Sequence, residues 1–446
     1  RSRGLGDVYK RQIKNAEVYT EQGIFEKKDI YVEEGKFVDH IPEDTREVDG
    51  EGCYAIPGLT DIHFHGCMGK DFCDGTEEAI QTIADYEASV GVTTIAPATM
   101  TFSEEKLLEI ARAAKAHKNE RGADLCGINM EGPFIAPKKK GAQNGKYIHK
   151  PDTEMFDRLQ EAAGGLFKLV DIAPEVEGAM EFIRAKKDEV VLSIAHTTTD
   201  YDTAKEAIDT GVHHVTHLYN AMNPINHREP GPIIAAADSG VCGAELICDG
   251  VHIHPAVVRS TLKLFGEDKV IFVSDTMMAA GLEDGMYELG GQPVIVKGNR
   301  ATLEDGTLAG SNTNLMNCMK VAVQKMDVPL ETAVRCAAVN PAKSIGIYDR
   351  YGSITPGKVA NVVLLKKENL DIEGLMKVLN KESGVYGLSN GVSSDFRDLT
   401  AAAAEGQKPA QIALEVFAYR VAKYVGAYTA AMNGVDNIVF LSLIHI

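Results

Sequence analysis

The stretch Pro57-Gly-Leu-Thr-Asp-Ile-His-Phe-His-Gly66 decides the fold. It reads as a short apolar strand that ends in two histidines separated by a single residue. Because residues i and i+2 share one face of a strand, His63 and His65 can point to the same spot. A His-x-His pair is by itself a weak signal for a metal site, so its meaning depends on what the following strands carry.

From residue 57 onward, apolar strand-like runs alternate with longer amphipathic runs. Eight runs are predicted to be strands: 60–65, 93–98, 126–130, 168–173, 190–195, 213–218, 244–248 and 270–274. The helical patterns between them include 77–90, 104–117, 154–163, 177–187, 201–210 and 255–265. Eight buried strands with helical crossovers predict an α/β fold, a (β/α)8 TIM-like barrel over 57–349.

The regions that flank the predicted barrel differ from it. Short alternating runs in 13–56 predict a small β module, and 350–366 returns to strand character and is expected to rejoin it as a small β-sandwich. The opening residues 1–12 and the closing residues 441–446 have no periodicity, so we interpret them as a non-native leader and tail.

Metal-ligand residue types fall at the ends of several predicted strands. In a barrel these ends converge on one face, where active sites lie. Imidazoles and carboxylates at one point predict a divalent metal site, for which Zn²⁺ is well suited and Fe²⁺ or Mn²⁺ remain open. The candidate ligands are His63, His65, Glu131, His196, His217 and Asp275.

Each candidate also has a structural interpretation. A lone histidine at a strand end is often a hydrogen-bonded structural group, and Asp275 before Thr276 could be a helix cap. Ligand types on several consecutive strands favour the metal site over these readings. Seven further histidines are set aside because they do not all fit at one ion or lie away from it: His213, His214, His227, His254, His40, His117 and His445.

Composition excludes some functions. The formal charge is −18, which argues against general binding to nucleic acid or anionic lipid, and no run of 18 apolar residues predicts a membrane span. The eight cysteines form no C-x-x-C pair and are expected to be buried free thiols in a reducing compartment, which favours a cytoplasmic location.

The residues 57–66 resemble the opening of the amidohydrolase superfamily. The motifs Glu131-Gly-Pro-Phe, His217-Leu-Tyr-Asn-Ala-Met222, His227-Arg-Glu-Pro-Gly231 and Asp249-Gly-Val-His252 resemble the N-acetylglucosamine-6-phosphate deacetylase family, over about 13–366. This resemblance implies hydrolysis of the acetamide of N-acetylglucosamine 6-phosphate, with a Zn or Fe ion, one or two per subunit, and a homodimer.

The resemblance also implies roles. Glu131, His196 and His217 would hold the main ion, and His63 and His65 a second one, with Glu131 or Asp275 shared. Asp275 would be the general acid/base, and Arg228 would contact the sugar phosphate, in the neighbouring subunit's site if the chain forms a dimer. The implied substrate-binding residues are Ala142, Gln143, Asn220, Ala221, Arg228, Asp249, His252, Leu308, Ala309 and Gly310. Gln143 stands where the family often has a histidine, but its amide can still donate a hydrogen bond to the acetamido carbonyl.

Residues 371–440 resemble a fragment of acetate kinase, in which Asp395, Phe396 and Arg397 would contact ATP. We therefore expect a chimeric chain whose last part is a C-terminal α/β fragment of a different fold. Two other functions stay open for the barrel. One is a different metal-dependent amidohydrolase that acts on a cyclic amide or another N-acyl substrate, and the other is a non-enzymatic metal- or sugar-binding module.

Overall fold

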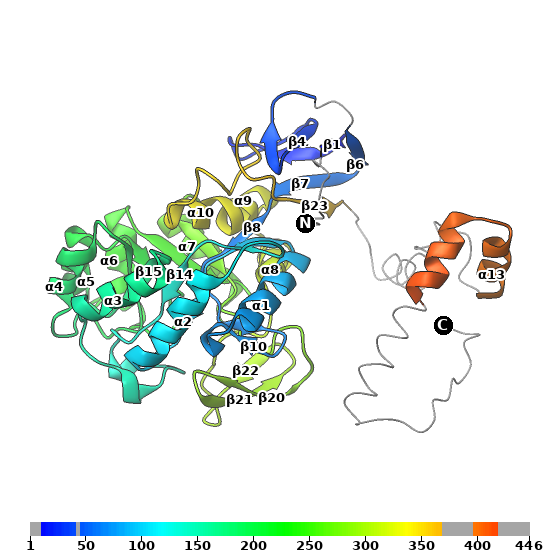
Figure 1. Cartoon of the computed structure of the whole chain (residues 1–446). Helices are drawn as coiled ribbons and strands as arrows, with labels where there is room; N and C mark the ends of the chain where they lie inside the picture. Colours follow the sequence, from blue (N-terminus) through cyan, green and yellow to red (C-terminus); the bar gives the residue numbers. More distant parts are fainter. Residues whose placement is uncertain (1–9, 42–44, 368–395, 418–446) are drawn as a thin grey trace, which may run out of the picture. The chain divides into compact units, whose positions relative to one another are not determined.

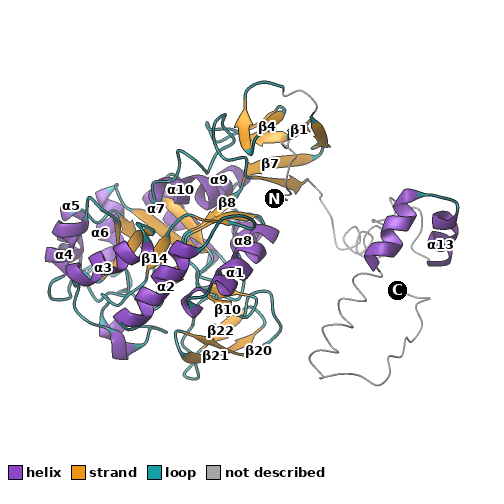
Figure 2. Cartoon of the chain, viewed as in Figure 1, coloured by secondary structure: helices purple, strands orange, loops and turns teal. Residues whose placement is uncertain are grey.

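The computed structural model describes residues 10–41, 45–367 and 396–417. The chain divides into two compact units, residues 1–366 and 367–446, and each is described by itself. Within the first unit, strands lie at the centre and helices surround them (Figure 2). No helix in the described ranges is long and apolar enough to cross a membrane.

Eight parallel strand positions form a ring in chain order. The second and third positions are each split into two short strands, which join a three-stranded sheet, β13-β11-β8, to a seven-stranded one, β12-β14-β15-β16-β17-β18-β19. The ring closes because the amide N–H of Asp275, after β19, donates to the carbonyl of His63, after β8, at 2.9 Å. The strands are β8 (Leu59–Asp61), β11 (Val92–Ile95), β12 (Ala98–Thr99), β13 (Asp124–Leu125), β14 (Ile128–Met130), β15 (Phe167–Ile172), β16 (Val191–Ile194), β17 (His214–Val215), β18 (Gly243–Ile247) and β19 (Val270–Val273). The predicted barrel is confirmed.

Amphipathic helices cover the outside of the ring (Figure 1). Sequence signals set their starts: Ser103 caps α2 through the amide of Lys106, and two glutamates occupy the first turn, where the helix dipole favours anions. The helices are α1 (Glu77–Ser89), α2 (Glu104–Ala116), α3 (Thr153–Ala163), α4 (Ala179–Lys186), α5 (Tyr201–Thr210), α6 (Gly231–Ser239), α7 (Pro255–Phe265), α8 (Leu315–Lys325), α9 (Leu330–Val334) and α10 (Asn340–Ser344).

Both flanks of the barrel build a small β module of two four-stranded sheets, β5-β4-β1-β6 and β23-β7-β2-β3. Its strands are β1 (Arg11–Lys14), β2 (Glu17–Tyr19), β3 (Phe25–Lys27), β4 (Ile30–Glu33), β5 (Lys36–Val38), β6 (Arg46–Asp49), β7 (Cys53–Pro57) and β23 (Val362–Lys366). The assignment of residues 1–12 to a leader is wrong at its end. Arg11 and Gln12 belong to β1 and pair with Val32 and Tyr31 of β4.

The prediction missed an antiparallel sheet after the last barrel strand, formed by β20 (Gly285–Leu289), β21 (Gln292–Lys297) and β22 (Arg300–Thr302). This sheet lies at the opposite end of the barrel from the β module (Figure 1). Gln292 donates a hydrogen bond to the carbonyl of Ala142, and Asn299 donates one to the carbonyl of Asp249 at 3.1 Å. The sheet therefore contacts the loops after the third and seventh strand positions, which lie at the carboxyl ends of the strands.

In the second unit, α13 (Phe396–Ala404) and a helix over 408–417 are described. Leu399, Ala402 and Ala410 form a small apolar cluster, whereas Ile412 is exposed. Of the predicted nucleotide contacts, Phe396 and Arg397 lie at the start of α13, and Asp395 lies outside the described residues. Most of 371–440 also lies outside them.

Candidate metal centre and active site

The structure brings together the six candidate ligands in one buried cluster. His63 and His65 follow β8, and Glu131 directly follows β14. The other three follow β16, β17 and β19, and all six side chains are buried. The convergence follows from the topology, because the carboxyl ends of parallel barrel strands meet on one face.

Glu131 lies at the centre of this cluster. Its Oε1 lies 2.8 Å from Nε2 of His196 and 3.2 Å from Nε2 of His217. Its Oε2 lies 3.3 Å from Nε2 of His65 and 3.6 Å from Nε2 of His63. One carboxylate therefore faces four imidazoles, two with each oxygen.

Asp275 faces the same cluster from the end of β19, which lies next to the end of β8 where the ring closes. Its Oδ1 lies 3.3 Å from Nε2 of His65 and 3.9 Å from Nε2 of His63. No described helix begins with Asp275 as its cap, so the cap interpretation of this residue is not supported. The carboxylate instead faces the histidines.

The backbone at these positions is strained. His196, His217 and Asp275 have φ values of 43°, 27° and 50°, in the left-handed region that favours glycine. Such residues cost about 1–3 kcal/mol each and cluster at functional sites, where the surrounding structure holds them. Three of the six candidate ligands therefore have a strained backbone.

The charges of the cluster are strongly interdependent. Burial alone would raise the pKa of Glu131, but His63, His196 and His217 hold that pKa well below its usual range. Burial likewise opposes ionisation of His63, yet Glu245 and Glu131 raise its pKa well above the ordinary value. The carboxylates and imidazoles of the cluster therefore stabilise one another's charged forms.

The donor set fits a divalent metal. Among the described residues, His63 Nε2 and Glu131 Oε2 are buried atoms without a hydrogen-bond partner. Two overlapping groups have ligand atoms within 4.8 Å of one another: His63, His65 and Asp275, and His63, Glu131 and His217. Nitrogen and carboxylate ligands in this number suit Zn²⁺ and Fe²⁺.

Sequence reasoning missed Glu245, which is fully buried in β18. Its Oε2 lies 2.9 Å from Nδ1 of His63 and accepts the amide N–H of His217 at 3.0 Å. The signal was available, because Glu245 is the one charged residue in the otherwise apolar run 243–247. A carboxylate in such a strand needs a buried partner.

Two predicted substrate-binding segments border the cluster. The amide of Ser311 donates to the carbonyl of Asp275 at 2.7 Å, which places Gly310, the last residue of the loop Leu308–Gly310, beside that residue. Gly310 has φ +69°, and a Cβ there would lie 2.9 Å from the Asp275 carbonyl oxygen. Only glycine fits such a turn without strain.

Loop residues 141–143 lie close to His196. A Cβ on Gly141 would contact the His196 ring at 3.5 Å, and the carbonyl of the next residue, Ala142, accepts from Gln292. Gln143 is buried, and its Oε1 accepts the amide N–H of Thr101 at 2.7 Å. This bond identifies Nε2 as the donor end of the Gln143 amide.

Other predicted substrate residues lie in loops after the sixth and seventh strand positions. Asn220 donates to the carbonyl of His217 at 3.1 Å, and Ala221, with φ 51°, accepts from the amide of Thr197. Asp249 Oδ2 lies 2.8 Å from Nδ1 of His252, which leaves Nε2 of that ring for other contacts.

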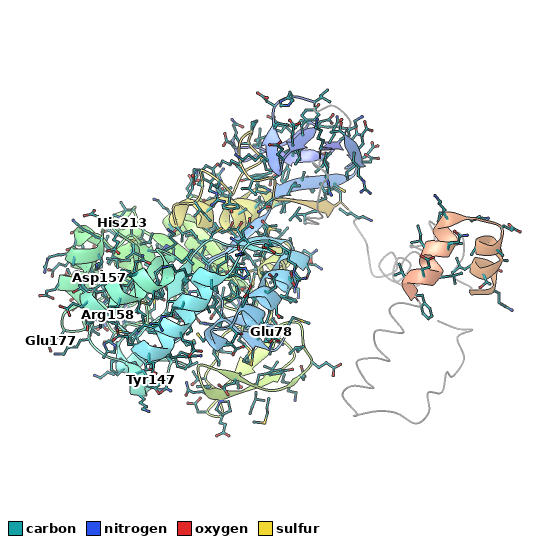
Figure 3. The ribbon with its side chains drawn as sticks, viewed as in Figure 1. Glu78, Tyr147, Asp157, Arg158, Glu177 and His213 are labelled. Carbon is teal, nitrogen blue, oxygen red and sulfur yellow. The ribbon has the colours of Figure 1, made fainter. Side chains whose placement is uncertain are left out.

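The structure does not bring Arg228 to the cluster. It is exposed in the loop before α6, and within the described ranges its side chain has no ion pair or hydrogen bond. His213 is also exposed and lies at the outside of the barrel (Figure 3). His214 is buried instead, with its Nε2 2.9 Å from Glu245 Oε1.

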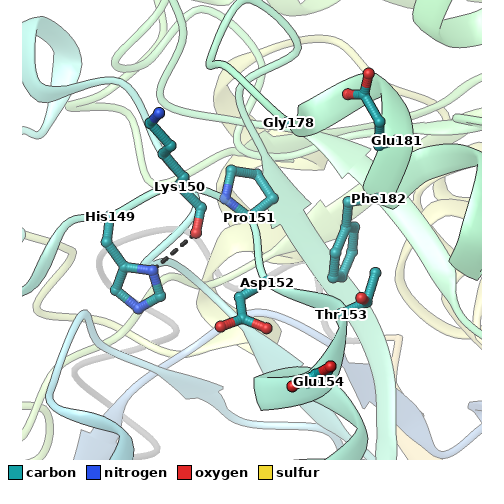
Figure 4. Close-up of a pocket in the computed structure, with 9 residues that line it drawn as sticks. All are labelled: His149, Lys150, Pro151, Asp152, Thr153, Glu154, Gly178, Glu181 and Phe182. Carbon is teal, nitrogen blue, oxygen red and sulfur yellow. Dashed lines mark hydrogen bonds between the residues drawn. The ribbon is translucent and has the colours of Figure 1, made fainter.

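An open depression of about 620 Å³ lies away from the ligand cluster, at the N-terminal ends of α3 and α4 (Figure 4). Asp152 caps α3 there, and Lys150 forms an ion pair with Glu177 at 2.5 Å. None of its lining residues belongs to the cluster. The candidate active site is therefore the histidine cluster, where the ligand-type side chains converge.

Comparisons with known proteins agree with this geometry. The amidohydrolase family model matches residues 54–399. N-acetylglucosamine-6-phosphate deacetylase from Bacillus subtilis is 36% identical over 368 residues, which are 80% of this chain and 93% of that protein. N-acetylgalactosamine-6-phosphate deacetylase from Escherichia coli O157:H7 is 30% identical over 351 residues, 78% of this chain and 92% of that protein.

Solved structures show the same relationship. A deacetylase variant from Mycobacterium smegmatis in complex with N-acetyl-D-glucosamine 6-phosphate has a TM-score of 0.74 and 29% identity, and covers 81% of this chain and 96% of that one. The Thermotoga maritima deacetylase has a TM-score of 0.71 and 30% identity, and covers 80% and 95%. These matches give no support to an acetate kinase fragment, and the family model runs on to residue 399, inside the segment 371–440. That interpretation, and with it the chimeric chain, is not supported.

Proposed function

Since the chain belongs to the amidohydrolase family, we propose that its histidine cluster is a divalent-metal centre that hydrolyses the acetamide of N-acetylglucosamine 6-phosphate, giving glucosamine 6-phosphate and acetate. The single observation that carries the proposal is the convergence of four imidazoles on the two oxygens of Glu131. The similarity to deacetylases over most of the chain supplies the substrate.

Glu131, His196 and His217 would hold the main ion, and His63 and His65 a second one, with Glu131 or Asp275 shared. When bound, the metal supplies Lewis-acid polarisation of the acetamide carbonyl and lowers the pKa of bound water to about 7. The Nδ1–H of His196 donates to the carbonyl of Lys139 at 2.8 Å, so the ring presents the lone pair of Nε2 to the ion.

Asp275 would move the proton. Its Oδ1 lies 3.3 Å from Nε2 of His65 and 3.9 Å from Nε2 of His63, two of the ring nitrogens that would hold the metal. Burial would raise the pKa of Asp275, but His65 and His63 lower it, so the carboxylate is available as a base. It can take a proton from the attacking water and pass it to the departing nitrogen. Gln143 Nε2 is a candidate donor to the developing oxyanion.

Arg228 would anchor the phosphate. A guanidinium offers a two-pronged donor to phosphate, and such anchoring holds the amide near the reacting groups. Arg228 is exposed and has no partner of its own within the described part of the chain, which fits a residue that reaches the site of a second copy in a homodimer. Asn220, Ala221, Asp249, His252 and the loop Leu308–Gly310 would complete the sugar pocket.

We also place the enzyme in the cytoplasm, with a small phosphosugar as its partner and neither nucleic acid nor membrane. All eight cysteines of the chain are free thiols, and six of them are buried. This usage is typical of a reducing compartment. The formal charge of −18 opposes contact with polyanions, whereas a single cation such as Arg228 is enough for one phosphate.

The proposal is tested by acetate release. The full chain is assayed with N-acetylglucosamine 6-phosphate, N-acetylgalactosamine 6-phosphate and unphosphorylated N-acetylglucosamine, before and after chelation and metal restoration. We expect metal-dependent turnover with a preference for the first substrate. Turnover that survives complete metal removal, or none on any N-acetyl sugar, would contradict the proposal.

A further inference from the structure

Glu245 lies within a buried polar chain that runs from Ser344 through His214 to His63 of the candidate metal centre. Its side chain is fully buried and accepts three hydrogen bonds. Oε2 accepts from Nδ1 of His63 at 2.9 Å and from the backbone amide of His217 at 3.0 Å. Oε1 accepts from Nε2 of His214 at 2.9 Å.

The chain continues below His214. The Nδ1 atom of that ring lies 2.9 Å from the hydroxyl of Ser344, at the end of α10. Because an ionised Glu245 can only accept, His214 donates from Nε2 and its Nδ1 accepts the Ser344 hydroxyl. The hydrogen bonds therefore run in one direction, from the Ser344 hydroxyl to His214 and from His214 to Glu245. The side chains of His214 and Glu245 are fully buried.

The same bond orients the ring of His63. When this ring is neutral, Nδ1 carries the proton that it donates to Glu245, and Nε2 presents a lone pair. Within the described part of the chain, Nε2 has no hydrogen-bond partner, and it faces Glu131 Oε2 at 3.6 Å and Asp275 Oδ1 at 3.9 Å. In this position between two carboxylates, Nε2 of the neutral ring is oriented to bind a metal ion and has no protein N–H or O–H group from which to accept a hydrogen bond.

The proposed ligands of the main ion, His196 and His217, would not depend on the Glu245–His63 bond in the same way. The ring of His196 is oriented by the carbonyl of Lys139, and Glu245 contacts His217 only through its backbone amide. Both of these rings keep their approach to Glu131 Oε1 without help from the Glu245–His63 bond. Removal of Glu245 should therefore affect the two sides unequally.

We propose that Glu245 is the positioning residue for the second ion, because it holds His63 with Nε2 facing both Asp275 Oδ1 and Oε2 of Glu131, the same oxygen that faces His65. The inference rests on the proposed metal-dependent function, but it concerns which ion is bound and not the reaction itself. Glu245 contacts no reacting atom and acts only through His63. Loss of such a partner typically weakens metal affinity about 10- to 100-fold.

The test measures Zn²⁺ stoichiometry and affinity by metal analysis and by competition with a chromogenic chelator, with thermal unfolding as a check of the fold. Wild type should bind two ions per chain. Glu245→Gln keeps an acceptor for His63 but not the negative charge, and should bind the second ion about 10- to 100-fold more weakly. Glu245→Leu should bind one ion only.

Asp124→Asn is the matched control, because Asp124 is a buried barrel carboxyl in β13 whose described bond is from the hydroxyl of Tyr351 at 3.2 Å and not from a histidine. It should bind both ions like wild type. If Glu245→Leu does not fold, Glu245→Gln alone decides the question. Two ions with wild-type affinity in a folded Glu245→Gln, or only one ion in wild type, would overturn the inference. A wild-type chain that binds no ion would instead refute the proposed metal centre.

Discussion

The Nε2 atoms of His196 and His217 lie 3.0 Å apart, and both face Oε1 of Glu131. His196 uses its Nδ1–H on the carbonyl of Lys139, so its Nε2 carries a lone pair when the ring is neutral. Without a cation, these three atoms would share at most one or two protons at close range. A divalent ion satisfies all three at once, which makes their convergence a strong indication of metal binding.

Glu131→Gln should abolish metal binding on this side and deacetylation with it. The amide loses the negative charge that faces four imidazoles and places an N–H group where a ligand oxygen is required. Metal content and acetate release are measured on the same sample. Glu154→Gln, an exposed change in the first turn of α3, is the control. Full metal occupancy with normal turnover in Glu131→Gln would remove Glu131 from the ligand set. The variants His196→Ala and His217→Ala should lose metal and activity as Glu131→Gln does.

Asp275→Asn should lower turnover about 10²-fold or more and leave most of the fold intact, as expected for loss of a general acid/base. A residue that only capped a helix would instead cost about 1 kcal/mol of stability and leave the rate alone. Steady-state rates and thermal unfolding separate these outcomes. The exposed Asp209→Asn serves as the control, and a wild-type rate in Asp275→Asn would assign the proton transfer to another group.

The barrel and the ligand cluster could be predicted from sequence for a physical reason. Parallel strands buried on both faces produce near-continuous apolar runs, and polar residues at their carboxyl ends must meet on one face. His63, Glu131 and His217 are such residues, and the structure brings them together. Fold topology therefore carried most of the information about the site.

Other features were not predicted from the sequence because they depend on backbone pairing or on single residues. Arg11 and Gln12 extend the ladder of β1 through main-chain bonds, which side-chain alternation does not report. Glu245 stands alone in an apolar strand, and only the structure shows that His63 is its partner. The alternating run of β21 was open to recognition, since Val294 and Val296 are buried and their neighbours exposed.

Arg228→Ala should weaken use of the phosphorylated sugar far more than that of unphosphorylated N-acetylglucosamine. A charge-assisted contact is worth about 1.5–3 kcal/mol, which corresponds to about 10- to 100-fold in selectivity. The ratio of kcat/KM for the two substrates is the measurement. Arg112→Ala, an exposed arginine on α2, controls for the loss of one positive charge. Equal losses on both sugars would mean that Arg228 has a structural role.

Asp71→Asn should change how stability depends on pH. Burial raises the pKa of Asp71 to about 6, from an ordinary value of 3.8. Between these values the folded form binds a proton that the unfolded chain has released, so this contribution to stability is full below the unfolded pKa and is lost as pH rises through 6. Asparagine keeps the oxygen that accepts the Cys73 amide at 2.7 Å but does not titrate.

The variant should therefore gain stability relative to wild type by about 1 kcal/mol between pH 5 and pH 7.5, since one pKa unit corresponds to about 1.4 kcal/mol. Urea unfolding of both proteins at the two pH values measures this difference. A constant difference between the two proteins across the range would mean that Asp71 does not titrate there.

A chain that ends at Lys366 should keep full deacetylase activity and stability. β23 (Val362–Lys366) completes the β module by pairing with β7 over five residues, and none of the candidate site residues lies in 367–446. Acetate release and thermal unfolding of this shortened chain are compared with those of the full chain.

A chain that ends at Ala360 is the control, because it also removes β23 and leaves the edge of β7 and the apolar side chains of the module uncovered. It should be clearly less stable, since a strand is lost together with the apolar contacts of Val362 and Leu364. We also expect no kinase activity from 371–440, because phosphoryl transfer needs a phosphate loop, a metal and an acceptor site assembled together. A large loss of deacetylation on removal of 367–446 alone would make that unit part of the working enzyme, and ATP-dependent formation of acetyl phosphate by the full chain would restore the kinase interpretation.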